Sequence, residues 1–393
     1  MSLLASLLVD RRGDFRVGLG EAAGVVADLG VFVPLAAALV LVNGLDAGSV
    51  FLLGGLLYLA AGLVFRVPFP VQPLKALTAI AVAQRLPPQV VYAAGIELGA
   101  LLLLISVGGA ADVVAKAFTK PVIRSLQLGV GLLLLVAAAK LVLDPPEVFT
   151  GLRDSAWLAV LAVATFGGVV WAARRGKYWA ALAALAAGIA ATAVVARPEL
   201  SAPELHLPSF ALPPASAFGT AILLLVVPQF PLTFGNAVVA VNDLSHEYFG
   251  PRARRVSPSR ICLTDGTANI VAGLLGGMPM CHGAGGLTAH VKLGARTAGV
   301  NLLIGGSFLP LGLFFAEQIP VILGLLPVWA LAAFLAYAGV RHAWLAHDLR
   351  GTPLAIALVA GGLGAVTGNL AITAATALLA DHGRRLLARA PRG

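Results

Sequence analysis

Two short segments combine prolines, glycines and polar side chains within an otherwise apolar sequence. They are Phe69-Pro70-Val71-Gln72-Pro73-Leu74-Lys75 and Met278-Pro279-Met280-Cys281-His282-Gly283-Ala284-Gly285-Gly286. Prolines interrupt helices, and glycines let a ligand approach bare backbone amides. Free amides at the start of a helix attract anions. The two segments, here called the first break and the second break, are therefore candidate halves of one anion site.

Polar groups in and after the two breaks supply the candidate ligands. Gln72 offers amide donors, and Lys75 places a positive charge in the first turn of a short helix. His282 has three open interpretations, because it could donate to a ligand, titrate, or cap the helix. Lys75 could instead reach an interface or pair with a carboxylate. The candidate binding residues at the breaks are Gln72, Pro73, Lys75, His282, Gly283, Ala284 and Gly285.

A third candidate element lies between the two breaks. Gln229, Thr233 and Asn236 recur at i, i+4 and i+7 in an apolar helix that also contains Pro228 and Pro231. A polar stripe inside a membrane usually faces protein or water. The stripe is therefore either part of the anion site or a set of hydrogen bonds between helices.

Two carboxylates are candidates for coupling transport to an ion. Asp28 lies deep in the first apolar segment and shares a helical face with Glu21. A carboxylate inside a membrane is costly and is a functional candidate by default. Asp28 is the preferred coupling group, with a structural capping role as the alternative, and Glu97 is the second candidate.

The composition identifies a membrane protein. Hydrophobic residues make up 59% of the 393 residues and charged residues 11%, and the mean hydropathy is +0.93. A soluble domain carries about 25% charged residues. The net charge of +9 comes from basic clusters between apolar segments, as the positive-inside rule expects, so it does not indicate a nucleic-acid partner. Cys262 and Cys281 suggest neither a disulfide framework nor a metal site.

The apolar segments predict an all-α polytopic bundle, since the alternating strands of a membrane barrel are absent. Basic residues at both ends of 352–380 require that stretch to enter and return, with Gly364, Gly368 and Asn369 at the turn. This gives fourteen segments in a 7+7 inverted repeat, with two half-helices meeting in the middle of the membrane. The expected segments are 18–41, 48–65, 73–86, 88–107, 120–143, 155–173, 178–196, 217–241, 259–276, 282–295, 297–316, 319–340 and the pair within 352–380.

Four stretches resemble the molybdate-transporter family, a branch of the sulfate permease superfamily. They are 27–34, 68–75, 228–236 and 277–287, so the likeness runs through both halves. The family often has Gly where this chain has Ala27. The resemblance implies a core domain that moves against a gate domain, often within a homodimer, and molybdate as the cargo.

The resemblance and the charge pattern together give the expected domain organisation. The core domain would comprise 18–107 and 217–317, and the gate domain 108–196 and 318–381. The remaining parts would be a cytoplasmic N-terminus at 1–17, an extracytoplasmic loop at 197–216 between the repeats, and a cytoplasmic tail at 382–393.

The expected function is secondary active transport of a tetrahedral oxyanion, molybdate first, across an inner membrane. Alternating access would be of the elevator type, and proton symport is one way to offset the cost of importing a dianion. Sulfate and tungstate present similar oxygens and stay open, as do a nucleobase substrate and an anion channel. No enzyme motif, cofactor site or metal-ligand spacing is present in the sequence.

Overall fold

A computed structural model describes residues 13–107, 110, 119–145, 155–175, 186–194, 197–210 and 212–389. Nearly all of the regular structure in these residues is helical, as the sequence predicts. The exception is a pair of two-residue strands, β1 (Gln72–Pro73) and β2 (Met280–Cys281), which lie at the two breaks. The strands pair with each other in antiparallel fashion.

The helices of the first half follow the expected apolar segments to within a few residues. The predicted segment 178–196 lies partly outside the described residues, which are helical at 186–194. The helices are α2 (Leu19–Asn43), α3 (Ala47–Phe65), α4 (Lys75–Gln84), α5 (Pro88–Ser106), α7 (Lys120–Leu143) and α8 (Ser155–Arg174).

The second half begins with one long helical run that changes type several times. It consists of α10 (Ala215–Ala221), the π-helix η1 (Ile222–Val226), α11 (Val227–Leu232), the π-helix η2 (Thr233–Val239), α12 (Ala240–Phe249) and the 3₁₀ turn η3 (Gly250–Arg255). The later elements are α13 (Pro258–Leu274), α14 (Ala284–Leu293), α15 (Gly299–Phe314), α16 (Gln318–Gly324), α17 (Val328–Trp344), η4 (Leu345–Asp348), α18 (Gly351–Thr367) and α19 (Leu370–Arg389).

Three boundaries differ from the sequence prediction. The segment expected at 217–241 continues as helix to residue 255. The segment expected at 319–340 is two helices, α16 and α17, because Pro327 precedes α17 and cannot continue a helix from α16. Residues 382–389 of the expected tail continue α19. The turn expected near Gly368 is confirmed, since Gly368 ends α18 with a φ of 65°.

Within the described residues, five helices are long and apolar enough to cross a membrane, or six if α15 and α16, which meet at 111°, count as one span. Helices α4 and α14 have ten residues each and so cover about 15 Å, half of a hydrocarbon core of about 30 Å. The protein is thus a multi-pass helical membrane protein, whereas the count of fourteen spans is not established by these lengths.

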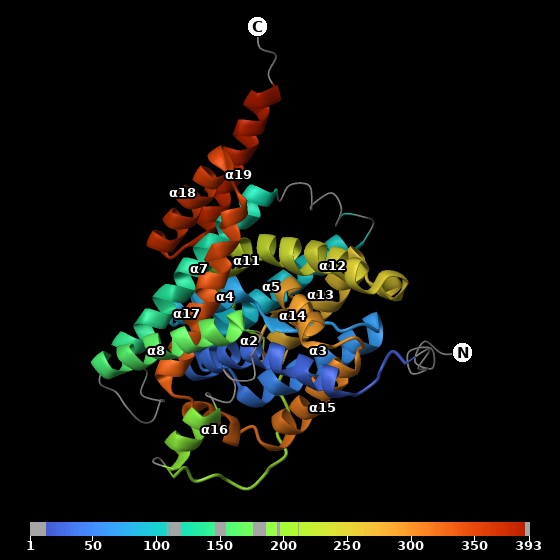
Figure 1. The fold of residues 1–393 in the computed structure, drawn as a ribbon, viewed down its shortest axis with the longest axis vertical. Coiled ribbons are helices and arrows are strands. Elements are labelled where there is room, and N and C mark those ends of the chain that lie inside the picture. Colours follow the sequence, from blue (N-terminus) through green and yellow to red (C-terminus); the bar gives the residue numbers. More distant parts are fainter. Residues whose placement is uncertain are drawn as a thin grey trace.

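The two halves interleave in a reciprocal way. Helix α3 packs against α15, and α13 packs against α5, so the helix before each break packs against the helix that follows the short helix of the other half. Helices α7 and α17 cross where a methyl group on Gly131 would lie 2.5 Å from the carbonyl oxygen of Gly339, and one on Gly339 2.7 Å from that of Gly131. Figure 1 shows α7, α8 and α17 on one side of the molecule and α3, α13 and α15 on the other.

Candidate functional site

The two breaks meet directly. Gln72 of β1 lies opposite Cys281 of β2, and Pro73 lies opposite Met280. The amide of Leu74 donates to the carbonyl oxygen of Pro279 at 3.2 Å. The predicted meeting of two interrupted segments is therefore present, and the contact between them is a short antiparallel ladder.

One buried asparagine holds each break. Asn301 of α15 donates to the carbonyl oxygen of Phe69 at 2.6 Å and accepts from the Phe69 amide at 3.0 Å. Asn269 of α13 makes the same two hydrogen bonds with Met280, donating to its carbonyl oxygen at 2.8 Å and accepting from its amide at 2.7 Å. Buried backbone groups need such partners when they leave a helix. The two side chains therefore replace the neighbouring strands that β1 and β2 lack.

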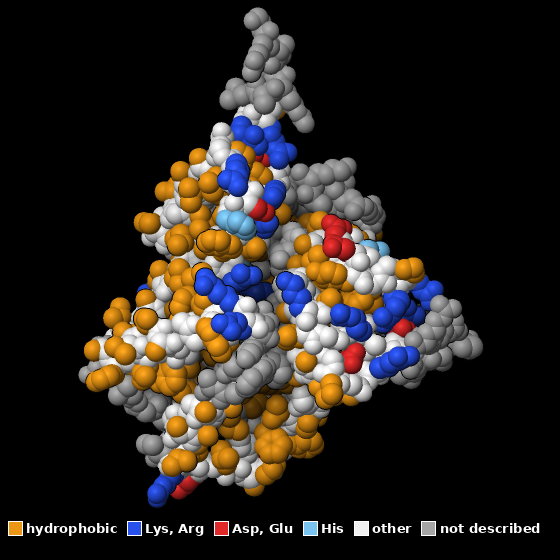
Figure 2. Space-filling model, in the orientation of Figure 1, with side chains coloured by type: hydrophobic (Ala, Val, Ile, Leu, Met, Phe, Trp, Pro, Cys, Tyr) orange, Lys and Arg blue, Asp and Glu red, His pale blue; other side chains and the backbone are white. Residues whose placement is uncertain are grey.

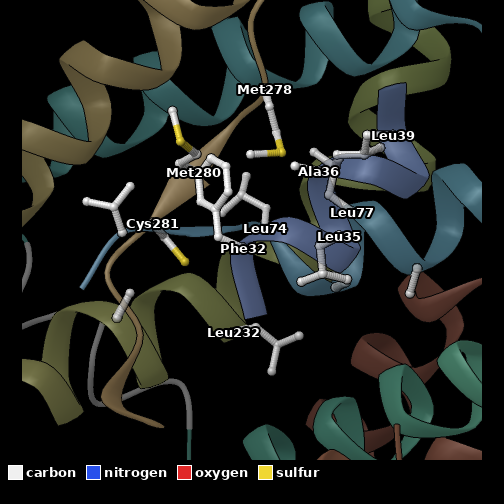
Figure 3. Close-up of a cluster of buried hydrophobic side chains, with 14 of the residues drawn as sticks. Phe32, Leu35, Ala36, Leu39, Leu74, Leu77, Leu232, Met278, Met280 and Cys281 are labelled. Atoms are coloured by element: carbon white, nitrogen blue, oxygen red, sulfur yellow. The ribbon is translucent and has the colours of Figure 1, made fainter. Parts of the chain in front are cut away.

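Apolar packing fixes the breaks against α2. Phe32, Leu35 and Leu39 of α2 are almost fully buried, as are Leu74 and Met280. Figure 3 shows these side chains gathered with those of Leu77 and Met278 around the paired segments. Helices α4 and α14 begin directly after this cluster, so their amide ends start from a fixed place.

A cavity of about 570 Å³ lies beside the starts of α4 and α14. It runs from buried Gln72 to Lys292 and Arg341, which are exposed. The described residues that line it include no Asp or Glu. Figure 2 shows Lys and Arg side chains gathered across the middle of one face of the molecule. The charged and polar lining residues are Gln72, Lys75, Arg124, Gln127, Asn236, Thr288, Lys292, Tyr337, Arg341 and His342.

Polar groups of the two breaks lie close together at the inner end of the cavity. The ammonium of Lys75 donates to Oε1 of Gln72 at 2.7 Å. A methyl group on Gly283 would lie 3.4 Å from Nζ of Lys75 and would collide with Oε1 of Gln72, so a side chain here would displace the Gln72 amide. A side chain at Gly285 would meet nothing within 4 Å. Amide donors, an ammonium and open backbone thus converge, which is an arrangement suited to an anion.

Five of the predicted binding residues line this cavity: Gln72, Lys75, Asn236, Ala284 and Gly285. Pro73 and Gly283 adjoin it as neighbours of Gln72 and Ala284 in the chain. These positions bring both breaks and the eighth predicted segment to one space. Their role in binding stays a prediction.

Gln229 and Thr233 are buried away from the cavity lining. The amide of Gln229 donates to Oγ1 of Thr233 at 2.9 Å and accepts from the Leu77 amide at 3.0 Å. They thus tie the long helical run to α4. Asn236 faces the cavity because Thr233 to Val239 form a π-helix, in which each residue advances less around the axis than in an α-helix.

His282 is fully buried and points away from the cavity toward α13. Its Nδ1 lies 2.8 Å from the carbonyl oxygen of Pro70, and its Nε2 lies 3.2 Å from Oδ1 of Asp265. In this conformation the imidazole therefore links the two breaks to α13.

The coupling candidates have different positions. Asp28 is a residue of α2, and its side chain lies outside the described part of the structure. Glu97 is a half-buried residue of α5 whose Oε2 has no hydrogen-bond partner among the described residues. Glu97 does not line the cavity.

The cavity also has cations that sequence reasoning did not assign to it. Arg124 comes from α7, Lys292 from the end of α14, and Arg341 from α17. Arg124 is held by Asp348, with 3.0 Å from Nε to Oδ1 and 2.7 Å from Nη2 to Oδ2. In the sequence these residues belong to the basic clusters that flank apolar segments. They differ from other residues of those clusters because, in the folded structure, they line the same cavity as Lys75.

The sequence matches the family described as "Molybdate transporter of MFS superfamily" over residues 20–134 and 221–341, which together exceed half of the chain and contain both breaks. Molybdate transporter 1 of Arabidopsis thaliana is 29% identical over 372 residues, covering 85% of this chain and 81% of that protein. Molybdate transporter 1 of Chlamydomonas reinhardtii is 28% identical over 438 residues, covering 84% of each.

Solved structures share the fold at low identity. The transmembrane domain of the cyanobacterium bicarbonate transporter BicA aligns with a TM-score of 0.68 and 16% identity, covering 93% of this chain and 98% of that one. The murine solute carrier 26 family member A9, an anion transporter in the inward-facing state, aligns with a TM-score of 0.67 and 12% identity, covering 98% and 71%.

Proposed function

The chain belongs to the molybdate transporter family, and from that membership we propose that it carries molybdate across a membrane by elevator-type alternating access. Members of the family and the similar proteins are transporters, so the chain is a transporter and not an enzyme. The observation that carries the choice of cargo is the cavity, whose described lining combines four Lys and Arg residues with no carboxylate.

The chemistry of the cavity fits a tetrahedral dianion. Lys75 supplies charge, while Gln72, Asn236 and the amides from Gly283 to Gly285 supply hydrogen bonds. Charge-assisted hydrogen bonds are about twice as strong as neutral ones. Gln229, Thr233 and His282 would contribute by fixing α4 and the second break. A tungstate or sulfate ion would present the same kind of oxygens and is the competing cargo.

We place the moving boundary between two domains. The core domain would comprise 18–107 and 217–317, and the gate domain 108–196 and 318–381. The cavity lies along this boundary, because Lys75, Asn236 and Lys292 belong to the first set and Arg124 and Arg341 to the second. Sliding of one set past the other would carry an anion bound at the breaks.

The conformation supports an assignment to the inward-facing state. The cavity opens at Lys292 and Arg341, and basic residues mark the cytoplasmic side. At the other end of α4 the two sets of helices touch. Lys140 donates to the carbonyl oxygen of Ala83 at 2.8 Å, and Arg85 pairs with Asp144 at 2.7 Å. These contacts, here called the outer seal, would close the extracytoplasmic side.

Reciprocal packing supports an inverted repeat of seven plus seven segments. The pairs α3 with α15 and α5 with α13 are what a twofold axis through the strand ladder would produce. In this arrangement both termini lie in the cytoplasm and the protein sits in an inner membrane, as a homodimer by analogy with its family.

Import of a dianion against a negative interior costs about 2.3 kcal/mol per charge per 100 mV, so accumulation needs a coupled ion movement that offsets this cost. Protons are the proposed coupling ion. Asp28 and Glu97 are carboxylates that could carry them.

The test is a competition series in reconstituted vesicles. Radiolabelled molybdate uptake is measured at two pH values against unlabelled molybdate, tungstate, sulfate and uracil. Competition by molybdate and tungstate above sulfate, with none by uracil, is expected. Uptake that does not saturate and shows no exchange between labelled and unlabelled molybdate would identify a channel instead.

A further inference from the structure

The fully buried pair Asp265 and His282 lies directly behind the second break. Both side chains have no exposed surface, and Oδ1 of Asp265 lies 3.2 Å from Nε2 of His282. The rings of Phe65 and Phe69 meet the imidazole edge-on, with centroids 5.7 and 4.5 Å away. The pair is thus enclosed by apolar groups, and the binding mechanism described above does not use its carboxylate.

The neighbours of His282 determine how many protons the pair holds. Nδ1 lies 2.8 Å from the carbonyl oxygen of Pro70, which can only accept, so Nδ1 must carry a hydrogen. The contact between Nε2 and Asp265 then needs one more proton, either on the imidazole or on the carboxyl group. Both arrangements contain the same number of protons, and the pair is neutral overall in each.

The surroundings of Asp265 argue against the state that lacks this proton. His282 is the one described residue that contacts the carboxylate oxygens of Asp265. A buried carboxylate that faces the Nε2 lone pair of His282 is disfavoured, because burial removes its hydration and the backbone amide of His282 replaces it only in part. A proton shared between Asp265 and His282 therefore stabilises the conformation described here.

We propose that Asp265 and His282, in preference to Asp28 and Glu97, form the proton-binding site that couples proton entry to anion entry, an inference that rests on the proposed transport of an oxyanion. His282 immediately precedes Gly283, the N-cap of α14, and Ala284 and Gly285 line the cavity. Loss of the proton leaves a net negative charge behind the amides that face the anion. Anion binding and protonation of the pair therefore favour each other.

Other titratable or charged groups face the pair from the elements packed around it. On α13 itself, Cys262 lies one turn before Asp265. Strand β2 contributes Cys281, whose thiol interacts electrostatically with Lys75 and Asp265. Helix α5 carries Tyr92 and Glu97, α3 carries Tyr58, and η2 has no titratable residue. Tyr58 donates to the Val71 carbonyl at 2.6 Å and Arg66 pairs with Asp14, so both have partners of their own.

A proton can approach the pair from one side. Thr264 is half-buried, and its Oγ1 lies 3.5 Å from Nε2 of His282. The hydroxyl also contacts the carbonyl oxygens of Arg260 and Ile261 at 3.0 Å. A hydroxyl both donates and accepts, so Thr264 is a suitable relay between the pair and water that enters beside α13.

The experiment compares Asp265→Asn with wild type in vesicles that hold a pH-sensitive dye. The near-isosteric amide keeps the shape but cannot hold the shared proton. Exchange of radiolabelled for unlabelled molybdate at equal pH should persist in the variant. Accumulation driven by an inward proton gradient, and the accompanying acidification, should fall at least tenfold.

Glu21→Gln is the matched control. Glu21 is a buried core carboxylate that accepts from the Arg296 amide and from Thr297, and a glutamine can keep those bonds. It should behave as wild type. Proton-driven accumulation by Asp265→Asn equal to wild type would overturn the inference. So would loss of coupling in Glu97→Gln alongside normal coupling in Asp265→Asn.

A second measurement needs no variant and stays decisive if Asp265→Asn fails to fold. Calorimetric titration of wild type with molybdate, in buffers of different ionisation enthalpy, counts the protons taken up on binding. Uptake approaching one proton per anion is expected when the pair starts deprotonated. If molybdate binds with no proton uptake between pH 5 and 9, a range of about two pH units either side of neutrality, the proposed role of the pair is refuted. The proposed transport function is not affected by that result. Absence of molybdate binding would refute both.

Discussion

The side chain of Asn301 pairs with both backbone polar groups of Phe69, donating at 2.6 Å and accepting at 3.0 Å. Phe69 belongs to the first half of the chain and Asn301 to the second. One amide therefore performs two tasks, because it satisfies the first break and binds the two halves together.

Removal of this amide should destabilise the fold. Asn301→Ala would leave the buried N–H and C=O of Phe69 without partners, at about 1–3 kcal/mol each. We expect a loss of at least about 2 kcal/mol, seen as a lower unfolding temperature in detergent. Asn242→Ala, which removes only a contact with neighbouring Asp243, is the control. Equal unfolding temperatures for the two variants would contradict the role given to Asn301.

Lys75 should determine affinity for the anion. Lys75→Met removes the charge at the inner end of the cavity and keeps the length of the side chain. A charge-assisted hydrogen bond contributes about 1.5–3 kcal/mol, so molybdate affinity should fall by about 10- to 100-fold. Lys75→Arg keeps the charge and should bind more tightly than Lys75→Met. Titration calorimetry of the purified variants measures this, and unchanged affinity in Lys75→Met would exclude Lys75 from the site.

The outer seal should be weak. Side chains of Arg85 and Asp144 are 54% and 77% exposed, and such pairs contribute about 0–1 kcal/mol. Arg85→Ala should therefore shift the balance of inward- and outward-facing states by no more than about fivefold. Labelling of a cysteine introduced beside the cavity reports this balance. The exchanged pair Arg85→Asp with Asp144→Arg should restore it, and a larger shift that the exchange does not reverse would show that the seal is more than this ion pair.

The inverted repeat predicts a contact for the opposite state. Gln72 and Cys281 are taken as equivalent positions of the two repeats, and the same difference in residue number relates Ala83 to Lys292. By the offset that relates Gly131 to Gly339, Lys140 corresponds to Asp348. Lys140 contacts Ala83 on the closed side, so Lys292 should reach Asp348 when the cytoplasmic side closes.

Cross-linking tests this contact. A Lys292→Cys and Asp348→Cys pair should cross-link under conditions that favour the outward-facing state and should then stop uptake, which a reductant restores. Pairing Lys292→Cys with a cysteine at Asp144, in the outer seal, is the control. Equal cross-linking of both pairs would argue against the predicted closure.

The sequence was sufficient for the helices and for the meeting of the breaks, because apolar length and proline determine where a membrane helix starts and stops. The division between α16 and α17 was not predicted, because residues 319–340 are apolar throughout and long enough for one span, although Pro327 breaks the helix there. Likewise the sequence did not reveal the π-helix that turns Asn236 toward the cavity, because π geometry has no clear residue signature.

The candidate site was predictable only in part. Gln72 and Lys75 could be placed because they stand in the break itself. The direction of His282 could not, since residues in an irregular segment have no fixed periodicity. Arg124 and Arg341 appear as ordinary interfacial charges until the fold brings them to the cavity. The pairing of Asp265 could not be predicted, because its partner His282 is 17 residues away, inside the irregular second break.

The cavity is open to water and lined by cations, so it attracts small mobile anions. Lys75, Lys292 and Arg341 line it, while Arg124 is already neutralised by Asp348. Chloride or phosphate from the surroundings will collect there, and any cargo has to displace them. The apparent dissociation constant of the cargo therefore depends on the anions in the surrounding solution as well as on the protein. In the cell, selectivity requires the cargo to displace abundant chloride from the cavity.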